Sequence, residues 1–531
     1  KEGKKLGMRI YYDMLHQEFK ATKSFRDVES YTIDSLYLAV RLHKQYSDKF
    51  VERLVSSVGQ KLKDNHELSE AGTTFLGHIE HLYSLMCALL KFPQTEIYEH
   101  ERTEVSLKLM DYLENNVQIR KDMFFTYVQY LVDLHTSLQN FTEAGMTQLQ
   151  HIRMVDWTDD NVAAVGPFDT STERIRKEQL YRSSISLFDR GESWERCIEM
   201  CNRLQEYYQH ERYDYLALSE TLSLEASFFQ KIATASRFYP YYYRVMFYGD
   251  FEEDPSLTHH EWVYRGKHLQ QVMQFAESFK KKFPEVKILM SADTPTAEVM
   301  NQTRQAISIT TLTVSRECDM RQKPPEQKQF DQNRTPEVVN FHRSNNVSVF
   351  TYSKAVQKSE QKKPDNEFKD LWDQRTFLRT EIEFPSNRRR AVVVERKEIM
   401  IHPIRNAIEA IVSKTEELLA NAYQVRESKL AEVDVNQLSM NLQGTIDAAV
   451  SGGTKLYVEA FLTPKYLIEY PNQRGNVREL KTAMLEQQDR LKEALAIFGE
   501  RCGETYKGLN DHLGEYYIKM VETNSEVLRL D

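Results

Sequence analysis

The chain has 531 residues, a formal net charge of −9, and only 18 glycines and 14 prolines. The scarcity of helix breakers favours a helical protein, and the length allows roughly two to four domains with real cores. No dense basic stripe of the nucleic-acid-binding type is visible, and no apolar run approaches the ~18 residues of a membrane span. The chain starts at Lys1 rather than at methionine, so we expect a fragment, in which a missing signal peptide proves little.

The cysteines indicate a reducing compartment. There are five of them, an odd number, widely spread along the chain, which is not a disulfide framework. Cys197 and Cys201 are four residues apart in the helical text ERCIEMCNRL and share one helix face. No further ligands are spaced to complete a zinc site, so we interpret both as small core side chains.

Residues 1–240 show a helical pattern. The segment VERLVSSV (51–58) places its apolar residues at i, i+3, i+4 and i+7, which forms one apolar stripe. A similar stripe recurs between Phe124 and Leu138. Successive amphipathic helices predict a stacked helical array, although no strict sequence repeat is present.

From 241 to 396 the period changes to two. Alternation between Leu378 and Phe384 predicts a half-buried strand. Between Ile307 and Val314 the alternation slips by one residue, which a β-bulge would explain. No long helices separate these strands, so an antiparallel arrangement is expected.

From Ile401 the helical period returns, with Pro403 where a first helical turn tolerates proline. The helices that follow are enough for a bundle. The pattern is broken once by AAVSGG (448–453). Two adjacent glycines are unusual inside a helix, so the break is either a loop between core helices or a functional tip.

Enzyme motifs are missing. HHEW (259–262) lacks the i, i+4 histidine pair of a metalloprotease helix, and GGTK (452–455) has the wrong order for a phosphate loop. The basic run Arg388–Arg390 is short, and we interpret it as a solvated turn rather than a phosphate track. Covalent chemistry by this chain is therefore a weak hypothesis.

Several co-linear motifs resemble the exchange-factor region of the dedicator-of-cytokinesis (DOCK) family. Coverage runs from about Val117 to near the C-terminus, and the resemblance is nearest to the Rac-directed members that act with an engulfment-and-motility (ELMO) partner. The matching stretches are DLHTSLQNFTEAGMTQLQH (133–151), FDRGESWE (188–195), PDNEFKDLWDQRT (364–376), IHPIRNAIEAI (401–411) and NLQGTIDAAVSGGTKLYVEAFL (441–462).

The resemblance implies a mainly α fold with a central β lobe, in agreement with the patterns above. Residues 1–116 would be a helical-repeat segment that precedes the exchange region. Residues 117–240 would form a helical lobe that dimerises. Two packed antiparallel sheets would occupy 241–396, and a C-terminal helical bundle carrying a nucleotide-sensor loop would occupy 397–531.

In function, the resemblance implies a guanine nucleotide exchange factor for a Rho-type GTPase, with Rac first. Val450 would be the sensor of nucleotide and Mg²⁺, flanked by Ala449, Gly452 and Gly453. The chain would need no cofactor of its own, because it acts on GDP, GTP and Mg²⁺ bound to its partner. The implied GTPase-binding residues are Ile401, His402, Pro403, Asn441, Leu442 and Gly444.

The chemistry of such a sensor is simple. Mg²⁺ demands oxygen ligands in a near-octahedral array. An apolar valine supplies none and excludes water, so the ion leaves and the phosphates lose their countercharge. Gly452 and Gly453 would allow a close approach where a Cβ would clash.

Other implied partners are an ELMO-type adaptor, bound through regions mostly outside this chain, and a second copy in a homodimer. No nucleic acid partner is expected. The protein would be cytoplasmic and recruited to the plasma membrane, and it would contact the membrane only through segments not present in this chain. His402 stands where the family usually has serine, so the choice between Rac and the cell-division-control (Cdc) GTPase stays open. The alternative function is a non-catalytic helical scaffold that binds a GTPase or an adaptor.

Overall fold

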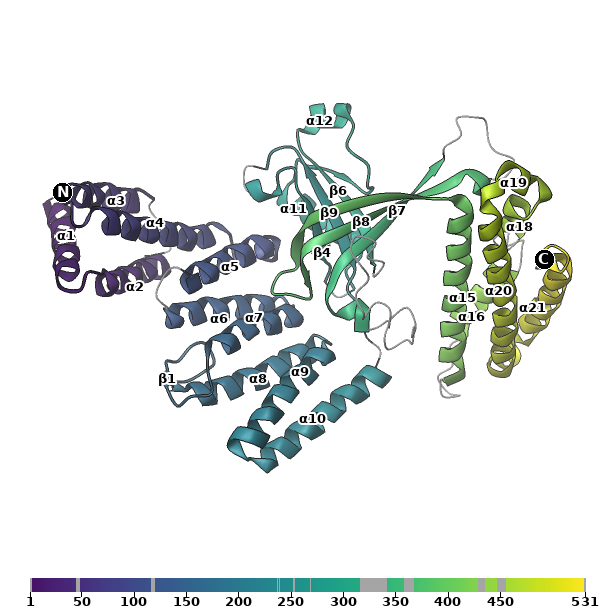
Figure 1. Ribbon diagram of the computed structural model, residues 1–531, viewed down its shortest axis with the longest axis horizontal. Helices are drawn as coiled ribbons and strands as arrows, with labels where there is room; N and C mark the ends of the chain where they lie inside the picture. Colours follow the sequence, from purple (N-terminus) through teal and green to yellow (C-terminus); the bar gives the residue numbers. More distant parts are fainter. Residues whose placement is uncertain are drawn as a thin grey trace. The chain divides into compact units, whose positions relative to one another are not determined.

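A computed structural model describes residues 2–43, 48–115, 120–235, 237, 239–251, 254–267, 269–315, 341–357, 367–427, 435–446 and 455–529. The protein is mainly helical, with one sheet region in the middle of the chain (Figure 1). The chain divides into two compact units. The first comprises Lys1–Phe350 and Leu378–Glu395, and the second Thr351–Phe377 and Arg396–Asp531. The division falls within three strands that belong to both units.

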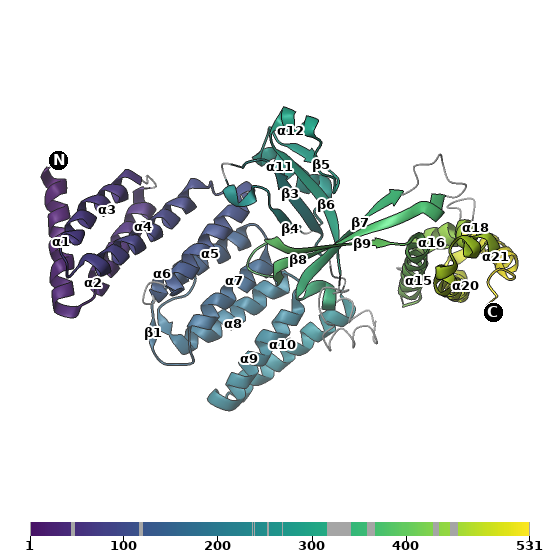
Figure 2. The same ribbon diagram turned by 45° about the horizontal axis from the view of Figure 1, so that its top comes forward.

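The first unit begins with consecutive helices, and from α3 onward each packs on the next (Figure 2). One continuous hydrophobic core runs through them. Cys197 and Cys201 are fully buried in it, as the sequence predicts, and burial raises the pKa of the Cys201 thiol to about 12. The helices are α1 (Glu2–Thr22), α2 (Arg26–His43), α3 (Asp48–Lys63), α4 (Ser69–Lys91), α5 (Glu99–Asn115), α6 (Lys121–Ser137), α7 (Phe141–Met154), α8 (Glu173–Arg190), α9 (Trp194–Tyr207) and α10 (Tyr215–Thr234), with a short hairpin of β1 (Asn161–Val162) and β2 (Ser171–Thr172) between α7 and α8.

Seven strands form one sheet in the order β3-β4-β9-β8-β7-β6-β5. β3 pairs antiparallel with β4 on one side and with β6 on the other, so six of the strands close into a barrel. Closure leaves β3 without a free edge. The strands are β3 (Tyr242–Tyr248), β4 (Glu261–Arg265), β5 (Lys287–Leu289), β6 (Ala306–Val314), β7 (Val347–Gln357), β8 (Leu371–Phe384) and β9 (Arg390–Ile401).

This topology corrects two expectations. Two packed antiparallel sheets were expected, but the strands join in a single sheet that closes on itself, and β5 pairs parallel with β6. A bulge was also expected in β6, yet its register with β3 is unbroken from Ala306 to Leu312. Ala306–Ile309 is buried on both faces, so side-chain alternation there does not report which residues face the core.

A helix closes one side of the barrel core. α11 (Val272–Lys282) buries Phe275 and Phe279 against the aromatic rings of β3 and β4. The Phe275 ring stacks on Tyr243 with centroids 4.3 Å apart and meets Tyr264 edge-on at 5.6 Å. A short helix, α12 (Ala297–Thr303), precedes β6.

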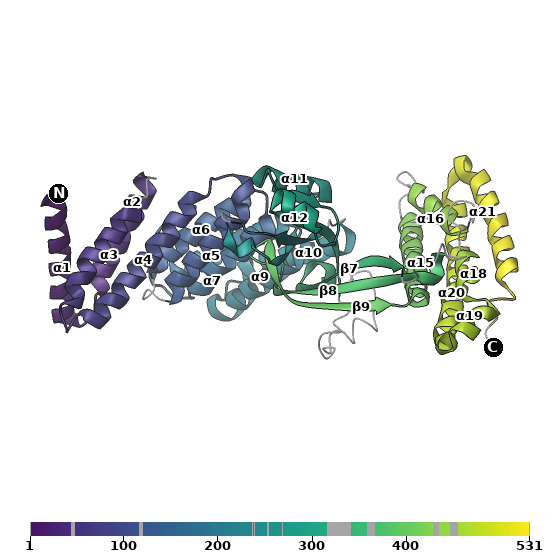
Figure 3. The same cartoon turned by 90° about the horizontal axis from the view of Figure 1, so that it is seen from above.

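The second unit contains the far parts of β7, β8 and β9 and the C-terminal helices. α15 and α20 lie side by side along much of their length (Figure 1), and α16 and α21 pack near them (Figure 3). Two apolar clusters hold these helices together, one around Leu418 and Phe498 and one around Ile408 and Phe461. The helices are α15 (Pro403–Glu427), α16 (Asn436–Ile446), α18 (Lys455–Phe461), α19 (Pro464–Glu469), α20 (Arg474–Arg501) and α21 (Gly503–Asn524).

Gly145 of α7 packs against Phe188 of α8. A Cβ at this position would lie 2.6 Å from the ring of Phe188, which is fully buried. We predict that Gly145→Ala lowers the stability of the protein by about 1 to 3 kcal/mol, because the ring has no room to retreat. Gly508→Ala in α21 is the control, since nothing lies within 4 Å of its Cβ position. Thermal melting should show a loss only for Gly145→Ala, and equal melting temperatures would contradict the tight contact.

Candidate functional site

The proposed sensor residues Val450, Ala449, Gly452 and Gly453 lie outside the described residues. Their place in the chain is nevertheless bounded. α16 ends at Ile446 and α18 begins at Lys455. In the chain, the residues of the predicted break therefore lie between these two helices of the second unit.

The segment Ile401–Pro403 joins the last strand to α15. Ile401 ends β9 and is buried, and Pro403 is the first residue of α15. His402 occupies the position before the helix, and its Nδ1 accepts a hydrogen bond from the backbone N–H of Ile404 at 3.4 Å. A side-chain acceptor here satisfies one of the free N–H groups of the first turn. The departure from serine thus keeps a group that can cap the helix.

Two aromatic rings surround His402. Trp372 on β8 and Tyr470 after α19 pack edge-on against the imidazole, with centroids 4.8 and 5.9 Å away. The neighbouring Arg405 pairs with Glu479 on α20 at 2.6 Å. Residues from three distant parts of the sequence therefore fix this corner. Trp372 lies within the stretch 364–376 quoted above, but no sequence motif indicated that Trp372 and Tyr470 lie next to His402.

The second predicted segment lies on α16. Asn441 is partly exposed, and its Nδ2 donates to Glu417 of α15 at 3.4 Å. Leu442 is fully buried in the core between α15, α16 and α20. Gly444 has no atom within 4 Å of its Cβ position. Asn441 and Gly444 can therefore reach a partner directly, whereas Leu442 can only support them by packing.

The two segments do not form one cluster. Asn441 faces Glu417, fourteen residues beyond Pro403 along α15, which corresponds to about 21 Å of helix. A single side chain or small ligand cannot bridge that distance. If both segments bind one partner, that partner presents a surface of protein size.

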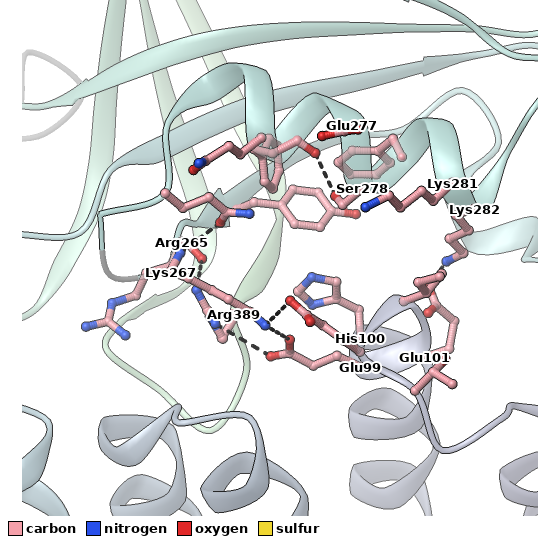
Figure 4. A pocket seen from close by; sticks show the side chains of 18 of the residues that line it. Glu99, His100, Glu101, Arg265, Lys267, Glu277, Ser278, Lys281, Lys282 and Arg389 are labelled. Carbon is pink, nitrogen blue, oxygen red and sulfur yellow. Dashed lines mark hydrogen bonds and ion pairs between the residues drawn. The ribbon is translucent and has the colours of Figure 1, made fainter.

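A separate group of charged residues occurs in the first unit, around a hollow of about 640 Å³ (Figure 4). Lys267 at the end of β4 reaches Glu96 and Glu99 at the start of α5, and Lys282 of α11 meets Glu101 at 2.5 Å. We call these residues, together with Glu143, Asp254, Arg265, Arg389 and Arg390, the ionic junction.

The basic run Arg388–Arg390 is part of this junction, which corrects its interpretation as a solvated turn. The side chains of Arg389 and Arg390 are 4% and 3% exposed. Arg390 pairs with Glu101 at 3.3 Å and Asp254 at 3.4 Å. Arg388 and Arg389 lie in the turn between β8 and β9, and Arg390 is the first residue of β9. The partners of these arginines are far away in the sequence, so spacing could not identify them.

The pKa values in the junction reflect mutual pairing. Burial alone raises the pKa of the Glu143 carboxyl, but Arg265 and Arg389 hold it below its ordinary value. Burial raises the pKa of Glu99 despite its cationic neighbours. For His100, burial and the nearby Arg390 lower the pKa well below its ordinary value.

The junction thus binds its own charges together. Within the part of the chain that the structure describes, no group of three or more His, Cys, Asp or Glu side chains is arranged to hold a metal ion. The same residues include no helix long and apolar enough to cross a membrane.

His135 of α6 gives the junction region an acid sensitivity. Its side chain is fully buried, its Nε2 lies 3.1 Å from the carbonyl of Asn387, and burial lowers its pKa to about 4. The unfolded chain binds more protons between pH ~6.5 and pH ~4, so stability must fall as the pH drops through that window. The loss attributable to His135 approaches about 3 kcal/mol below the window.

We therefore predict that His135→Gln, which retains a donor for Asn387, flattens the pH dependence of unfolding between about pH 6.5 and pH 4. His66→Gln, at an exposed histidine of the same unit, should leave the dependence unchanged. Denaturant unfolding at a series of pH values measures both. A parallel pH profile for His135→Gln and the parent would show that His135 does not titrate on unfolding.

Three family models match the chain in order. They are DHR-2, Lobe A at residues 108–234, DHR-2, Lobe B at 293–383 and DHR-2, Lobe C at 424–527. Together they match more than half of the chain.

Curated relatives extend the similarity. "Dedicator of cytokinesis protein 4" of Homo sapiens is 28% identical over 517 residues, which cover 96% of this chain and 25% of the relative. "Dedicator of cytokinesis protein 3" of Mus musculus is 30% identical over 497 residues, which cover 92% of this chain and 24% of the relative. "DOCK-like protein 1" of Saccharomyces cerevisiae is 22% identical over 444 residues, which cover 81% of this chain and 22% of the relative. The chain spans about a quarter of the length of these relatives.

Proposed function

Because the chain belongs to the dedicator-of-cytokinesis family through its DHR-2 region, we propose that it is a guanine nucleotide exchange factor for a Rho-type small GTPase. The observation that carries the proposal is the co-linear match of lobes A, B and C. It would promote nucleotide release without covalent chemistry and without a cofactor of its own. Rac is the first candidate partner.

In the proposed mechanism, the break between α16 and α18 enters the nucleotide site of the GTPase. Val450 occupies the space of Mg²⁺, supplies no ligand oxygen and weakens the hold on the phosphates. A thousandfold faster release corresponds to about 4 kcal/mol of barrier. Gly452 and Gly453 keep the tip thin beside the GTPase backbone.

The GTPase would rest on Ile401–Pro403 and on Asn441 and Gly444, with Leu442 as packing support. Their separation along α15 suits a partner of protein size. The helices before the sheet serve in this proposal as a repeat array and a dimerising lobe, and those after it as a bundle. We keep 1–116, 117–240, 241–396 and 397–531 as the proposed domain limits.

The exchange reaction itself tests the sensor. We predict that Val450→Ala slows release of fluorescent GDP from Rac by at least about tenfold, or about 1.4 kcal/mol of barrier. Binding to the GTPase should change little, since one small side chain buries little area. Chelation of Mg²⁺ should reduce the difference in release rate between Val450→Ala and the parent protein, because the loss of Mg²⁺ that Val450 promotes has then already occurred.

The matched control is Val521→Ala, the same truncation at a partly exposed valine of α21, outside the proposed GTPase surface. It should exchange at the parent rate. A Val450→Ala protein that melts normally and also exchanges at the parent rate would remove Val450 from the mechanism. Melting temperature, binding and release must therefore be measured on both variants.

The same assay over a panel of Rho-type GTPases separates the alternatives. Acceleration on the Cdc GTPase rather than Rac would reassign the partner. Binding without acceleration on any member would indicate the scaffold function. Turnover of GTP by the chain alone would indicate a hydrolase.

We further propose that α10 forms a homodimer interface. Tyr215, Leu222 and Phe229 are 66%, 47% and 54% exposed. Residues seven apart return to nearly the same side of a helix, with a drift of about 20° per heptad. α10 packs mainly on α9 and buries Phe228 there, so its outer side carries an apolar stripe suited to a second copy.

We predict that Phe229→Glu shifts the protein from dimer to monomer in light scattering at micromolar concentration. A charge in the centre of an apolar interface has no partner and is costly to desolvate. Leu38→Glu, at a leucine of α2 that is 51% exposed, controls for the added charge and should remain dimeric. A parent protein that is monomeric at these concentrations would refute the pairing.

We also propose an adaptor partner and a membrane contact for the full-length protein. An ELMO-type adaptor and the plasma membrane would bind regions of the full-length protein outside this chain. The protein would otherwise be cytoplasmic and act in cytoskeletal remodelling, cell migration and phagocytosis.

A further inference from the structure

A second hollow, of about 440 Å³, lies on the other side of three junction residues in the first unit. Arg265, Lys267 and Arg389 line both this hollow and the one in Figure 4. The second hollow is formed by the start of α7, the turn between α8 and α9, the segment before β3, the end of β4 and the turn between β8 and β9. We refer to it as the α7 pocket.

One cation of the α7 pocket stands outside the ion pairs of the junction. Four cationic side chains line the pocket, and three of them, Arg265, Lys267 and Arg389, are paired with Glu143, Glu96 and Glu99. The fourth cation, Arg190, comes from the end of α8 and is exposed. Its guanidinium lies 3.8 Å above the ring of Phe141.

Donors in the pocket remain unused. The Nε atoms of Arg265 and Arg389 are buried and have no hydrogen-bond partner among the described residues. The Arg389 side chain is only 4% exposed, and its Nε lies 3.9 Å from the nearest Glu143 oxygen. A buried guanidinium donor without a partner is unfavourable, so an acceptor in the pocket would be stabilising.

The start of α7 also lines the pocket. Asn140 precedes the helix but does not cap it. Its amide donates to Glu99 at 2.7 Å, and its carbonyl oxygen accepts from Arg389. Asn140 therefore leaves the start of α7 without a side-chain cap, and the Glu143 carboxyl of the first turn is held by Arg265 and Arg389.

From these observations we propose that the α7 pocket binds a small water-soluble phosphate monoester. Several guanidinium groups around one oxyanion suit the tetrahedral, multiply accepting phosphate. The volume exceeds the needs of a bare ion, and Phe141, Tyr239 and Pro240 supply apolar wall for an organic body. The ligand ties together five segments of the first unit, so it stabilises the folded state. This proposal does not depend on the exchange function.

Binding is tested by calorimetry and thermal shift on the whole chain with fructose 1,6-bisphosphate, inorganic phosphate and unphosphorylated fructose. We expect saturable one-to-one binding and a raised melting temperature with the sugar phosphate, weaker binding of inorganic phosphate, and none of fructose. No saturation by the sugar phosphate, or equal binding of fructose, would overturn the site.

The location is tested with Arg190→Ala, because Arg190 is exposed and outside the buried ion pairs. It should weaken binding by about tenfold or more, as expected for a lost charge-assisted contact, and Arg190→Lys should restore part of it. Lys281→Ala removes the same charge but lines only the neighbouring hollow, so it should change binding less than about twofold. Equal losses in Arg190→Ala and Lys281→Ala would show non-specific attraction and overturn the site.

Vesicles that contain phosphatidic acid distinguish a lipid head group from a soluble ester, since both present a phosphate monoester. The proposal predicts that the vesicles do not compete with the sugar phosphate. Retention on vesicles without binding of the soluble ester would overturn the proposed ligand class.

Discussion

The first unit depends on the ionic junction, where buried carboxylates of the helices meet buried guanidinium groups of the barrel. Glu99 and Glu101 belong to α5 and Glu143 to α7, whereas Arg265 belongs to β4, Arg389 to the turn before β9 and Arg390 to β9. Each charge is costly to remove from water, so no one of them can be buried without the others. The contact between helices and barrel is therefore specified by charge partners as well as by apolar area.

The junction also explains why the barrel holds its place on the helices. Apolar surfaces slide with little loss, because many packings bury similar area. A set of opposed charges with defined partners has one low-energy register. His135, whose imidazole meets the carbonyl of Asn387, adds a neutral hydrogen bond to the same turn between β8 and β9. The turn is thus held from α5, α6 and α7 together.

The same charges shape the two hollows beside them. One side of the junction is closed by mutual pairing. In the α7 pocket Arg190 stands outside these pairs, with its guanidinium over the ring of Phe141. In the second unit the proposed site does not depend on a cluster of buried charges. There the proposed partner surface is dispersed along α15, and a helix cap at His402 and core packing at Leu442 hold it in place.

The sequence by itself determined the order helices, strands, helices, because local periodicity reports which face of an element is buried. It placed Cys197 and Cys201 in a core, and its paired glycines Gly452 and Gly453, which lie outside the described residues, predict a break in the helical pattern. Five co-linear stretches of the sequence also indicated the family. Only the tertiary structure decided how the strands close, because β3 pairs with both β4 and β6, and strand pairing between distant segments leaves no local signal. Only the tertiary structure could turn Arg388–Arg390 from an exposed basic run into a buried anchor, because its carboxylate partners lie more than a hundred residues away in the chain.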